Sequence, residues 1–474
     1  MTAALPKPGV LRPHSIPQRI KRLHMVGIGG TGMCGIAEVL LSFGFQITGS
    51  DLVTSDVTDR LVSLGACIKA GHAAEAVGEA QVVVISSAVQ SDNPEVAEAR
   101  RRQIPVIRRA EMLAELMRLR WGIAVCGTHG KSTTTSMIGE VLTLAGFDPT
   151  IIVGGRLTGS NTGARVGQGE ILVAEADEYD QSFLQLQPIM AVATNIEPEH
   201  LECYGSFADL LGAFRRFLRS VPFYGRVIMS GDDHNLRQLK PELQRPVTVY
   251  GFDSTAPLSA ECVGADGLHT HSRVFRQGEL LGPLELQLPG VHNVHNALAA
   301  LAVAFELGVD WPTAKAALEQ FKGVRRRFEV VGEFGGKLLV DDYAHHPTEV
   351  RATLQAARAG FPNRRLVALF QPHLYSRAQR FAEEFGEALL VADVVIATDI
   401  YGSRENPIQG VTGQLIVDAL KRRGAREVHY IPDKSELPLK VAALLEPGDL
   451  IVTLGAGDIG RIGRQVFETG ETRP

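Results

Sequence analysis

Apolar residues fall in two patterns along this chain. Short uninterrupted apolar runs predict β-strands, and longer segments with apolar positions every three or four residues predict amphipathic α-helices. The two kinds of segment alternate over most of the chain, which favours parallel sheets covered by helices on both faces. We therefore expect an α/β fold built from doubly wound, mainly parallel sheets.

Three domains are expected, because 474 residues exceed what one hydrophobic core accommodates. Their expected boundaries are 22–120, 121–327 and 328–474, preceded by a proline-rich flexible arm at 1–21. The expected strands are, domain by domain, 24–28, 46–49 and 82–86; 122–126, 171–176, 190–194, 227–230 and 247–251; and 337–340, 366–370, 394–398, 428–431 and 450–454. Helices are expected at 33–43, 110–118 and 292–307. Residues 256–289 break the pattern and predict a small antiparallel insert, since apolar and polar residues alternate at 284–288.

Composition narrows the classes of function. Apolar residues make up 45% and charged residues 21%, which is typical of a soluble globular protein. The net charge of −5 and the pI of about 6.3 argue against a nucleic-acid partner. No run of about 18 apolar residues could span a membrane, and the arm lacks the apolar core of a signal peptide. The five cysteines are scattered without a Cys-x-x-Cys pair, so we expect a cytoplasmic protein.

The strongest local motif follows the strand expected at 122–126. It is a glycine turn that leads into a helix and consists of Gly127, Thr128, His129, Gly130, Lys131, Ser132 and Thr133. The N–H groups of such a turn bind phosphate oxygens, the lysine neutralises the β- and γ-phosphates, and the hydroxyl is placed for Mg²⁺. Val125 stands where the general pattern has a glycine. We interpret the segment as an ATP-binding loop; the alternative is a glycine-rich turn with a chance Lys-Ser pair.

A second glycine turn follows the first expected strand. It contains Gly27, Gly29, Gly30, Thr31 and Gly32, and Asp51 follows at the end of the next strand. This spacing matches the dinucleotide-binding fingerprint, in which a pyrophosphate lies at a helix N-terminus. Taken alone the motif suggests NAD. A UDP-sugar also carries a pyrophosphate, and the glycines could serve helix–sheet packing only.

Polar residues follow two strands of the central domain. Glu175 lies in the strand expected at 171–176, and His200 comes soon after the strand at 190–194. Carboxyl ends of parallel strands lie at one edge of a sheet, so both side chains are expected beside the phosphate loop. They are candidate Mg²⁺ ligands, although Mg²⁺ prefers oxygen, which disfavours His200. Without the neighbouring loop, a solvated acidic turn and a surface or helix-capping histidine would explain them better.

Two asparagines begin the helix expected at 292–307. Asn293 and Asn296 lie on one helical face, and an asparagine amide pairs well with adenine. Asparagine is also a good helix N-cap, so this motif is weak by itself.

The C-terminal domain carries polar residues after two strands, where open α/β sheets bind ligands. Asp342, Tyr343, His345 and His346 follow the strand at 337–340. The paired histidines suggest a metal site without an obvious partner, and Pro347 could simply begin a helix. Arg377 follows the next strand and could clamp a carboxylate or lie on the surface.

Taken together and in this order, these segments resemble the Mur ligase family. The motifs that carry the resemblance span nearly the whole chain and are 27–32, 49–51, 127–134, 175–178, 194–200, 292–296, 341–350 and 371–377. The stretch 342–349 resembles the branch of the family that joins L-alanine to UDP-N-acetylmuramate. The resemblance implies a Rossmann-like N-terminal domain for the UDP-sugar, a central P-loop ATPase domain with a small β insert, and a Rossmann-like C-terminal domain for the amino acid.

The resemblance also implies roles for individual residues. The residues expected to bind ATP are Gly127, Thr128, His129, Gly130, Lys131, Ser132, Thr133, Asn293, Asn296, Arg327 and Asp342. Those expected to bind the UDP-sugar are Gly29, Gly30, Thr31, Gly32, Asp51, His72 and Ser86. Those expected near the amino acid are Tyr343, His346 and Arg377. Ser132, Glu175 and His200 would hold Mg²⁺, as two ions. The catalytic candidates are Lys131, Glu175, His200 and His346, the last as a base.

The implied reaction is the ATP-dependent ligation of L-alanine to the lactyl carboxylate of UDP-N-acetylmuramate through an acyl phosphate, a step in peptidoglycan precursor synthesis. Three alternatives stay open. An NAD-dependent oxidoreductase would explain Gly27–Gly32 and Asp51 but not the loop at Lys131. A nucleotide-binding regulator would lack turnover, and a recycling ligase of the same family would add a preformed tripeptide instead of alanine.

Overall fold

The computed structural model describes residues 20–86, 88–155, 162–403 and 405–471. The arm expected at 1–21 lies outside these residues, except for its last two. Contacts divide the chain into two compact units. The first contains the N-terminal sheet and most of the central sheet, and the second contains residues 262–272, 285–294 and the C-terminal sheet.

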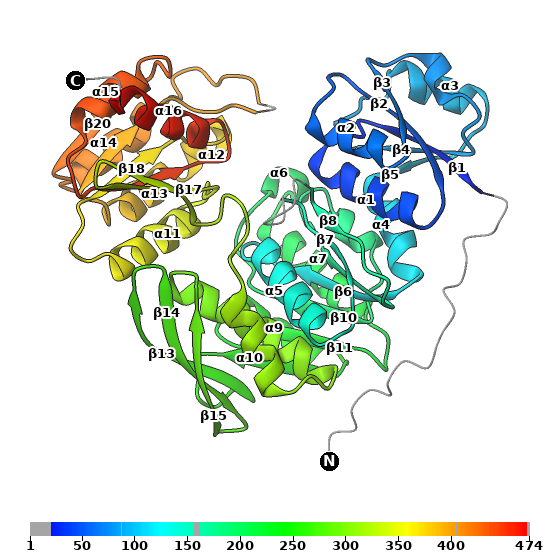
Figure 1. Ribbon diagram of the computed structural model, residues 1–474, viewed down its shortest axis with the longest axis horizontal. Helices are drawn as coiled ribbons and strands as arrows, with labels where there is room; N and C mark the ends of the chain where they lie inside the picture. Colours follow the sequence, from blue (N-terminus) through cyan, green and yellow to red (C-terminus); the bar gives the residue numbers. More distant parts are fainter. Residues whose placement is uncertain (1–19, 87, 156–161, 404, 472–474) are drawn as a thin grey trace. The chain divides into compact units, whose positions relative to one another are not determined.

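The N-terminal sheet has five parallel strands in the order β3-β2-β1-β4-β5 (Figure 1, blue). Its elements are β1 (Arg22–Val26), α1 (Thr31–Ser42), β2 (Gln46–Asp51), α2 (Asp56–Ser63), β3 (Cys67–Ala70), η1 (Ala74–Val77), β4 (Val82–Ile85), α3 (Pro94–Arg101), β5 (Val106–Arg108) and α4 (Arg109–Arg118). The first strand begins and ends two residues earlier than predicted, because Gly27 turns the chain with φ of +74°. The strand order reverses between β1 and β4, which is where such sheets bind ligands.

The central sheet has ten strands in the order β15-β14-β13-β12-β11-β10-β6-β9-β7-β8. Its elements are β6 (Trp121–Cys126), α5 (Lys131–Leu144), β7 (Thr150–Ile152), β8 (Ala164–Arg165), β9 (Ile171–Glu175), η2 (Ser182–Gln185), β10 (Met190–Ala193), α6 (Leu201–Tyr204), α7 (Phe207–Arg219), β11 (Arg226–Ser230), α8 (His234–Leu239), η3 (Lys240–Glu242), β12 (Val247–Gly251), β13 (Leu258–Asp266), β14 (His269–Arg276), β15 (Glu279–Leu286), α9 (Val291–Glu306) and α10 (Trp311–Gln320). Six neighbouring strands of this sheet pair in parallel, in the order β7-β9-β6-β10-β11-β12. Two-residue connections join β13, β14 and β15, and only antiparallel neighbours allow so short a link. The predicted antiparallel insert is therefore confirmed.

Helices of the central domain differ in how much of their surface is buried. In α7 the buried positions are Leu210, Ala213, Phe214, Phe217 and Leu218, which is the spacing of one helical face. Helix α5 is instead buried on most sides and packs against α10. The sheet and these helices hold the loop between β6 and α5 on a rigid base.

The C-terminal sheet has six strands in the order β16-β17-β21-β18-β19-β20, and only its edge pair β16–β17 is antiparallel (Figure 1, yellow to red). Its elements are β16 (Glu329–Phe334), β17 (Lys337–Asp342), α11 (Pro347–Gly360), β18 (Leu366–Phe370), α12 (Tyr375–Arg380), α13 (Ala382–Leu389), β19 (Val394–Ala397), α14 (Gln414–Arg422), β20 (Glu427–Tyr430), α15 (Leu437–Leu444), β21 (Leu450–Leu454) and α16 (Ile459–Glu471). Alternate residues of β18 pack into two separate cores, one with α11, α13 and α14 and the other with α15 and α16. Helices therefore cover both faces, as predicted for a doubly wound sheet.

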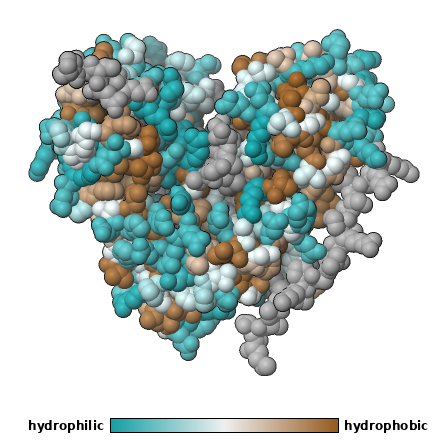
Figure 2. Space-filling view, in the orientation of Figure 1, coloured by the Kyte–Doolittle hydropathy of each residue, from teal (hydrophilic) through white to brown (hydrophobic). Residues whose placement is uncertain are grey.

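Hydrophilic and hydrophobic side chains are mixed over the face of the molecule seen in Figure 2. Among the described residues, no helix is both long and apolar enough to cross a membrane.

Candidate active site

The loop between β6 and α5 has the backbone form of a phosphate-binding turn. Gly127 has φ of +132°, and Gly130, which precedes α5, has φ of +82°. A Cβ on Gly127 would lie 3.0 Å from Asn195 O and closer still to the Thr194 hydroxyl. A Cβ on Gly130 would lie 2.6 Å from Asn296 Oδ1. Both glycines are therefore required by backbone angle and by space.

The residues after β10 fasten this loop in place. Thr128 N donates to Asn195 O over 2.9 Å, and His129 N donates to Asn195 Oδ1 over 2.8 Å. The Thr194 hydroxyl donates to His129 O over 2.6 Å. These hydrogen bonds hold the loop in one conformation, and a loop that needs no ordering binds a ligand at lower entropy cost.

Lys131 begins α5 and turns back over the loop. Its Nζ donates to Gly127 O over 2.7 Å and to Glu178 Oε2 over 2.8 Å. Burial alone would lower the pKa of Lys131, but the carboxylates of Glu178, Asp177 and Glu175 together raise it well above its usual range. Lys131 is therefore a cation held against the loop carbonyl of Gly127 and the carboxylate of Glu178.

Glu178 was not predicted as a site residue, yet it is the ion-pair partner of Lys131. Its side chain is 1% exposed, and burial raises its pKa. The sequence shows only an acidic stretch after β9. The pairing of Glu178 with a lysine 47 positions earlier is visible only in the folded structure.

Ser132 and Glu175 form the second part of the predicted site. The Ser132 hydroxyl donates to Glu175 Oε1 over 2.5 Å, and Glu175 Oε2 accepts a hydrogen bond from Gly154 N. Two adjacent oxygen donors beside a phosphate loop suit Mg²⁺, which binds hydroxyl and carboxylate oxygens. Thr133, the next residue, is buried in the first turn of α5.

His200 precedes α6 in a left-handed backbone conformation, with φ of +54°. Its Nε2 lies 3.5 Å from Glu199 Oε2 and 4.0 Å from Glu178 Oε1, and its Nδ1 lies 3.6 Å from Glu202 Oε1. Burial alone would lower the pKa of His200, but these carboxylates raise it above its usual value. The fold therefore brings His200 to the Lys131–Glu178 pair, and it must lose a proton before it can bind a metal.

The two asparagines of α9 are both buried. Asn296 Oδ1 accepts from the Thr134 hydroxyl over 3.2 Å and touches the loop at Gly130. Asn293 Nδ2 donates to Pro289 O over 2.8 Å. That bond uses the amide as a donor, so it is not the N-cap bond weighed as the alternative, in which a side-chain oxygen accepts.

The N-terminal turn is organised by Asp51 and Ser86. Gly29 N donates to Asp51 Oδ2 over 2.8 Å. A Cβ on Gly27 would lie 2.9 Å from Ser86 Oγ, at the end of β4. Gly30 and Thr31 lead into α1.

Arg109 is a further residue at this turn that was not predicted. A Cβ on Gly32 would lie 2.8 Å from Arg109 Nη1. A guanidinium beside the first turn of α1 suits a pyrophosphate.

His72 belongs to a buried polar cluster that the sequence did not reveal. Its Nδ1 lies 3.0 Å from Ser50 Oγ, and Ser50 donates to Glu95 Oε2 over 2.6 Å. Glu95 also lies 3.2 Å from His24 Nε2, and neither of these two side chains is exposed. Burial alone would raise the pKa of Glu95, but bonds from His24, Ser50 and Ala73 N lower it.

In the second unit, Asp342 ends β17 and organises the chain around it. Its Oδ2 accepts from Phe328 N and its Oδ1 from Ala344 N, each over 2.8 Å. Burial raises the pKa of Asp342 to about 6, against the opposing charge of Arg327. The Arg327 guanidinium carbon also lies 5.5 Å from the centre of the Tyr343 ring.

The paired histidines point to different partners. His345 Nδ1 lies 3.0 Å from Tyr343 O and 3.2 Å from Glu349 Oε2. His346 precedes α11, and its Nδ1 accepts from Thr348 N over 3.4 Å. Pro347 begins α11, as the simpler interpretation expected.

Arg377 lies in α12 and is buried, so it is not the surface arginine weighed above. Its Nη1 lies 3.0 Å from His373 Nδ1, and the His373 ring meets the His345 ring edge-on at 5.4 Å. Nearby, Gln371 Nε2 donates to Asp458 Oδ1 over 2.9 Å. Polar groups from the carboxyl ends of β17, β18 and β21 thus share one edge of the sheet.

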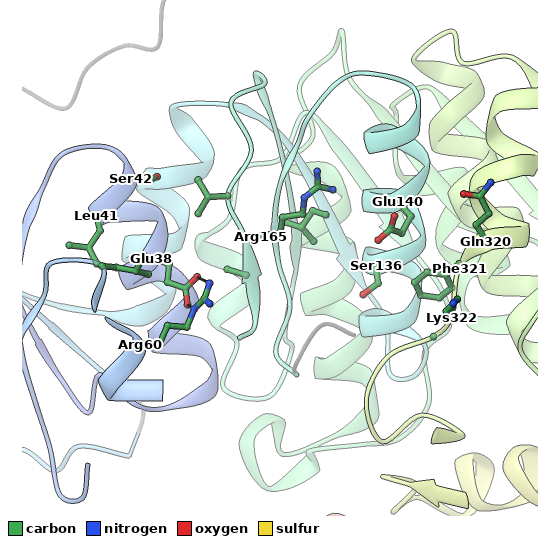
Figure 3. Close-up of a pocket in the computed structure, with 15 residues that line it drawn as sticks. Glu38, Leu41, Ser42, Arg60, Ser136, Glu140, Arg165, Gln320, Phe321 and Lys322 are labelled. Atoms are coloured by element: carbon green, nitrogen blue, oxygen red, sulfur yellow. Dashed lines mark hydrogen bonds and ion pairs between the residues drawn. The ribbon is translucent and has the colours of Figure 1, made fainter. Parts of the chain in front are cut away.

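A separate pocket of about 880 Å³ lies in the first unit (Figure 3). Its lining includes Glu38, Arg60, Ser136, Glu140 and Arg165, with Arg60 beside Glu38 in the figure. None of the loop residues 127–132 lines it. It is therefore distinct from the nucleotide-binding candidate.

Comparisons with known proteins cover nearly the whole chain. Residues 22–121 match the model of the Mur ligase family catalytic domain, residues 125–304 the Mur ligase middle domain, and residues 326–457 the Mur ligase glutamate ligase domain. The UDP-N-acetylmuramate–L-alanine ligase of Salinibacter ruber is 52% identical over 451 residues, 95% of both chains. That of Trichlorobacter lovleyi is 51% identical over 95% of this chain and 99% of its own.

Solved structures agree with these sequence relatives. The UDP-N-acetylmuramate–alanine ligase of Thermotoga maritima has a TM-score of 0.80 and 31% identity, covering 95% of this chain and 99% of that one. A murein peptide ligase of Psychrobacter arcticus, at 24% identity and a TM-score of 0.69, shares the fold over 96% of this chain and 99% of its own. The three-domain α/β fold predicted from the sequence is confirmed. This chain belongs to the Mur ligase family.

Proposed function

We propose that this protein uses ATP to join L-alanine to the lactyl carboxylate of UDP-N-acetylmuramate, a step in peptidoglycan precursor synthesis. The observation that carries the proposal is the hydrogen-bonded loop with Lys131, Ser132 and Glu175 at one end of the central sheet. Relatives about 50% identical over 95% of this chain, whose names state this reaction, support the choice of substrates.

The chemistry explains the need for ATP. The lactyl carboxylate attacks the γ-phosphorus of ATP, ADP leaves, and an acyl phosphate forms. The amine of L-alanine then attacks the carbonyl carbon, and phosphate leaves in place of the oxide that a free carboxylate would have to expel. Lys131 and the N-terminus of α5 offset the negative charge of the transferred group, chiefly through position and electrostatics.

Members of the family use ATP, typically with Mg²⁺. Ser132 and Glu175 fit this ion, because their oxygens already lie together beside the loop. His200 is proposed for a second ion. A bound Mg²⁺ would neutralise phosphate oxygens, while Lys131 would exchange Glu178 for a phosphate oxygen.

The remaining roles come from both units. Asn293 and Asn296 are proposed to face adenine. In the second unit, Arg327 and Asp342 are proposed for the phosphates and the ribose, and Tyr343, His346 and Arg377 for the amino acid. The proposed base is His346, whose Nδ1 accepts a hydrogen bond from Thr348 N.

The deciding experiment measures phosphate release with ATP, UDP-N-acetylmuramate and a panel of amines. Release that requires both the sugar nucleotide and L-alanine supports the proposal. Release with a preformed tripeptide but not with alanine would assign the recycling ligase instead. Tight NADH binding without UDP binding would favour the oxidoreductase hypothesis. Nucleotide binding without turnover would favour the hypothesis of a non-catalytic regulator.

A further inference from the structure

A relay of polar side chains links the core of the N-terminal sheet to its carboxyl edge. His24 lies in β1, Glu95 in α3 and Ser50 in β2, while His72 follows β3. The side chains of His24 and Glu95 have no exposed area, and that of His72 keeps 17%. His72 is therefore the end of the relay that reaches the surface, at the sheet edge where the glycine turn after β1 lies.

The Ser50 hydroxyl donates its hydrogen to Glu95 and not to His72. Glu95 Oε2 lies 2.6 Å from Ser50 Oγ and 3.2 Å from His24 Nε2, while Oε1 accepts from Ala73 N over 3.1 Å. Burial alone would raise the pKa of Glu95, but its bonds with His24, Ser50 and Ala73 N lower it, so Glu95 is a carboxylate that can only accept hydrogen bonds. The Ser50 hydroxyl therefore donates to Glu95.

The direction of this hydrogen bond determines which ring nitrogen of His72 carries a hydrogen. Because the only hydrogen of the Ser50 hydroxyl points to Glu95, Ser50 Oγ can only accept from His72 Nδ1, 3.0 Å away. Nδ1 must therefore carry a hydrogen, and the carboxylate oxygen of Glu95, 3.7 Å from Nδ1, favours the same arrangement. A neutral imidazole has one N–H, so Nε2 of His72 is left as an acceptor.

We propose that His72 recognises the nucleoside of the UDP-sugar as a hydrogen-bond acceptor through Nε2, and that Glu95 sets this polarity through Ser50. The ligand group must then be a donor, which means the uracil N3–H or a ribose hydroxyl, and not a uracil carbonyl. Glu95 is a positioning residue, since it acts through Ser50. The identity of the ligand rests on the proposed function, while the state of the ring does not.

The state of the ring is measured first, in the full-length protein without ligand. Nitrogen-15 spectra of histidine-labelled protein at pH 8, where an unperturbed histidine is neutral, distinguish the two tautomers. The His72 signals are assigned by their loss in His72→Gln among the 14 histidines. We expect hydrogen on Nδ1; hydrogen on Nε2 would overturn the inference without any variant having to fold.

Ligand polarity is measured next, by calorimetric titration with UDP and three analogues. N3-methyl-UDP lacks the base donor, and 2′-deoxy-UDP and 3′-deoxy-UDP each lack one ribose donor. We expect one analogue to bind about tenfold more weakly than UDP, because the donor that this analogue lacks is the one that pairs with Nε2. Equal affinity for all four ligands would overturn the inference.

Glu95→Gln tests the relay. A glutamine amide can donate to Ser50, so the Ser50 hydroxyl can donate to His72 Nδ1. The hydrogen of the His72 ring then lies on Nε2 instead of Nδ1. We expect the tenfold discrimination to disappear in this variant, with ADP affinity unchanged. The matched control is Glu98→Gln on the same helix, which removes a carboxylate paired with Arg101 and leaves the relay intact.

The outcomes separate the two proposals. Absence of any UDP binding by wild-type protein contradicts the proposed function. UDP binding with persistent discrimination in a folded Glu95→Gln variant contradicts the relay alone. If that variant does not fold, Ser50→Ala replaces it, and retained discrimination there contradicts the relay in the same way.

Discussion

The charged state of Lys131 and of Glu178 depends on the ion pair that the two residues form. Lys131 is held by Glu178 in a nearly buried pair, so each depends on the other. Removal of one member of a buried pair leaves an uncompensated charge, which costs more than the pair itself contributes. Loss of activity and loss of stability must therefore be measured separately at this site.

Lys131→Ala is expected to abolish ATP-dependent product formation and to lower the free energy of unfolding by about 3 kcal/mol, because Glu178 stays buried without its cation. Urea denaturation and phosphate release measure the two effects. The double variant Lys131→Ala/Glu178→Gln should regain most of the stability and none of the activity. Lys240→Ala, on an exposed helix end, is the control. An active Lys131→Ala enzyme would remove Lys131 from the mechanism.

Asp342 predicts a pH dependence of stability. Its folded pKa of about 6 lies above the ordinary aspartate value of 3.8, so the folded state binds the proton more tightly than the unfolded state does. This contribution is fully present below pH 4 and is lost as the pH rises through 6, a difference of about 3 kcal/mol. Asp342→Asn should remove it.

The measurement is the free energy of unfolding at several pH values between 4 and 8. Asn at position 342 also changes the bonds to Phe328 N and Ala344 N, but that effect is an offset independent of pH. The difference between wild type and variant should therefore change across this window. A constant difference would show that Asp342 ionises normally.

At the scale of elements, most strands were predictable and several contacts were not. Apolar runs such as those of β6 and β18 announce buried parallel strands, whereas β16 contains Gly332 and two glutamates and was missed as an exposed edge strand. Helix α3 was also missed, since its sequence PEVAEARR has few apolar positions. Glu95 in that helix meets His24 across 71 positions, and no local pattern reports such a pairing.

The loop at 127–132 can be proposed from the sequence because the residues that indicate it are local. Glycines, a lysine and a hydroxyl within six positions favour a phosphate-binding loop, and the rule that strand ends converge brings Glu175 and His200 towards it. Roles of Glu178, Arg109 and Glu95 depend on side chains that meet only after folding.

Gly127→Ala tests how tightly the loop is fitted. Gly127 and Gly146 both have positive φ, but a Cβ on Gly146 meets open space while one on Gly127 meets Thr194 and Asn195. We expect Gly146→Ala to cost about 1 kcal/mol of stability from the backbone angle, and Gly127→Ala about 2 kcal/mol more, with weaker ADP binding. Thermal unfolding and calorimetry measure both. Equal effects of the two variants would show that the loop yields freely.

For the whole molecule, the proposed reaction needs groups from both compact units on one substrate complex. The loop at Lys131 belongs to the first unit, and Arg377 belongs to the second. Closure of the units around the ligands is therefore expected. Small-angle scattering should give a smaller radius of gyration with a non-hydrolysable ATP analogue and UDP-N-acetylmuramate together than with either alone. An unchanged radius would argue against closure.

If ATP binds at Lys131 as proposed, the ion pair of Lys131 with Glu178 makes nucleotide binding an exchange of anions. A ligand that brings a phosphate oxygen to Nζ replaces the carboxylate, while a shorter ligand, such as adenosine, leaves the pair intact. The Glu178 carboxylate thus competes with a phosphate for Lys131, and the competition favours compounds with enough phosphates to reach the lysine. Selection by polyphosphate length would in this way follow from one ion pair.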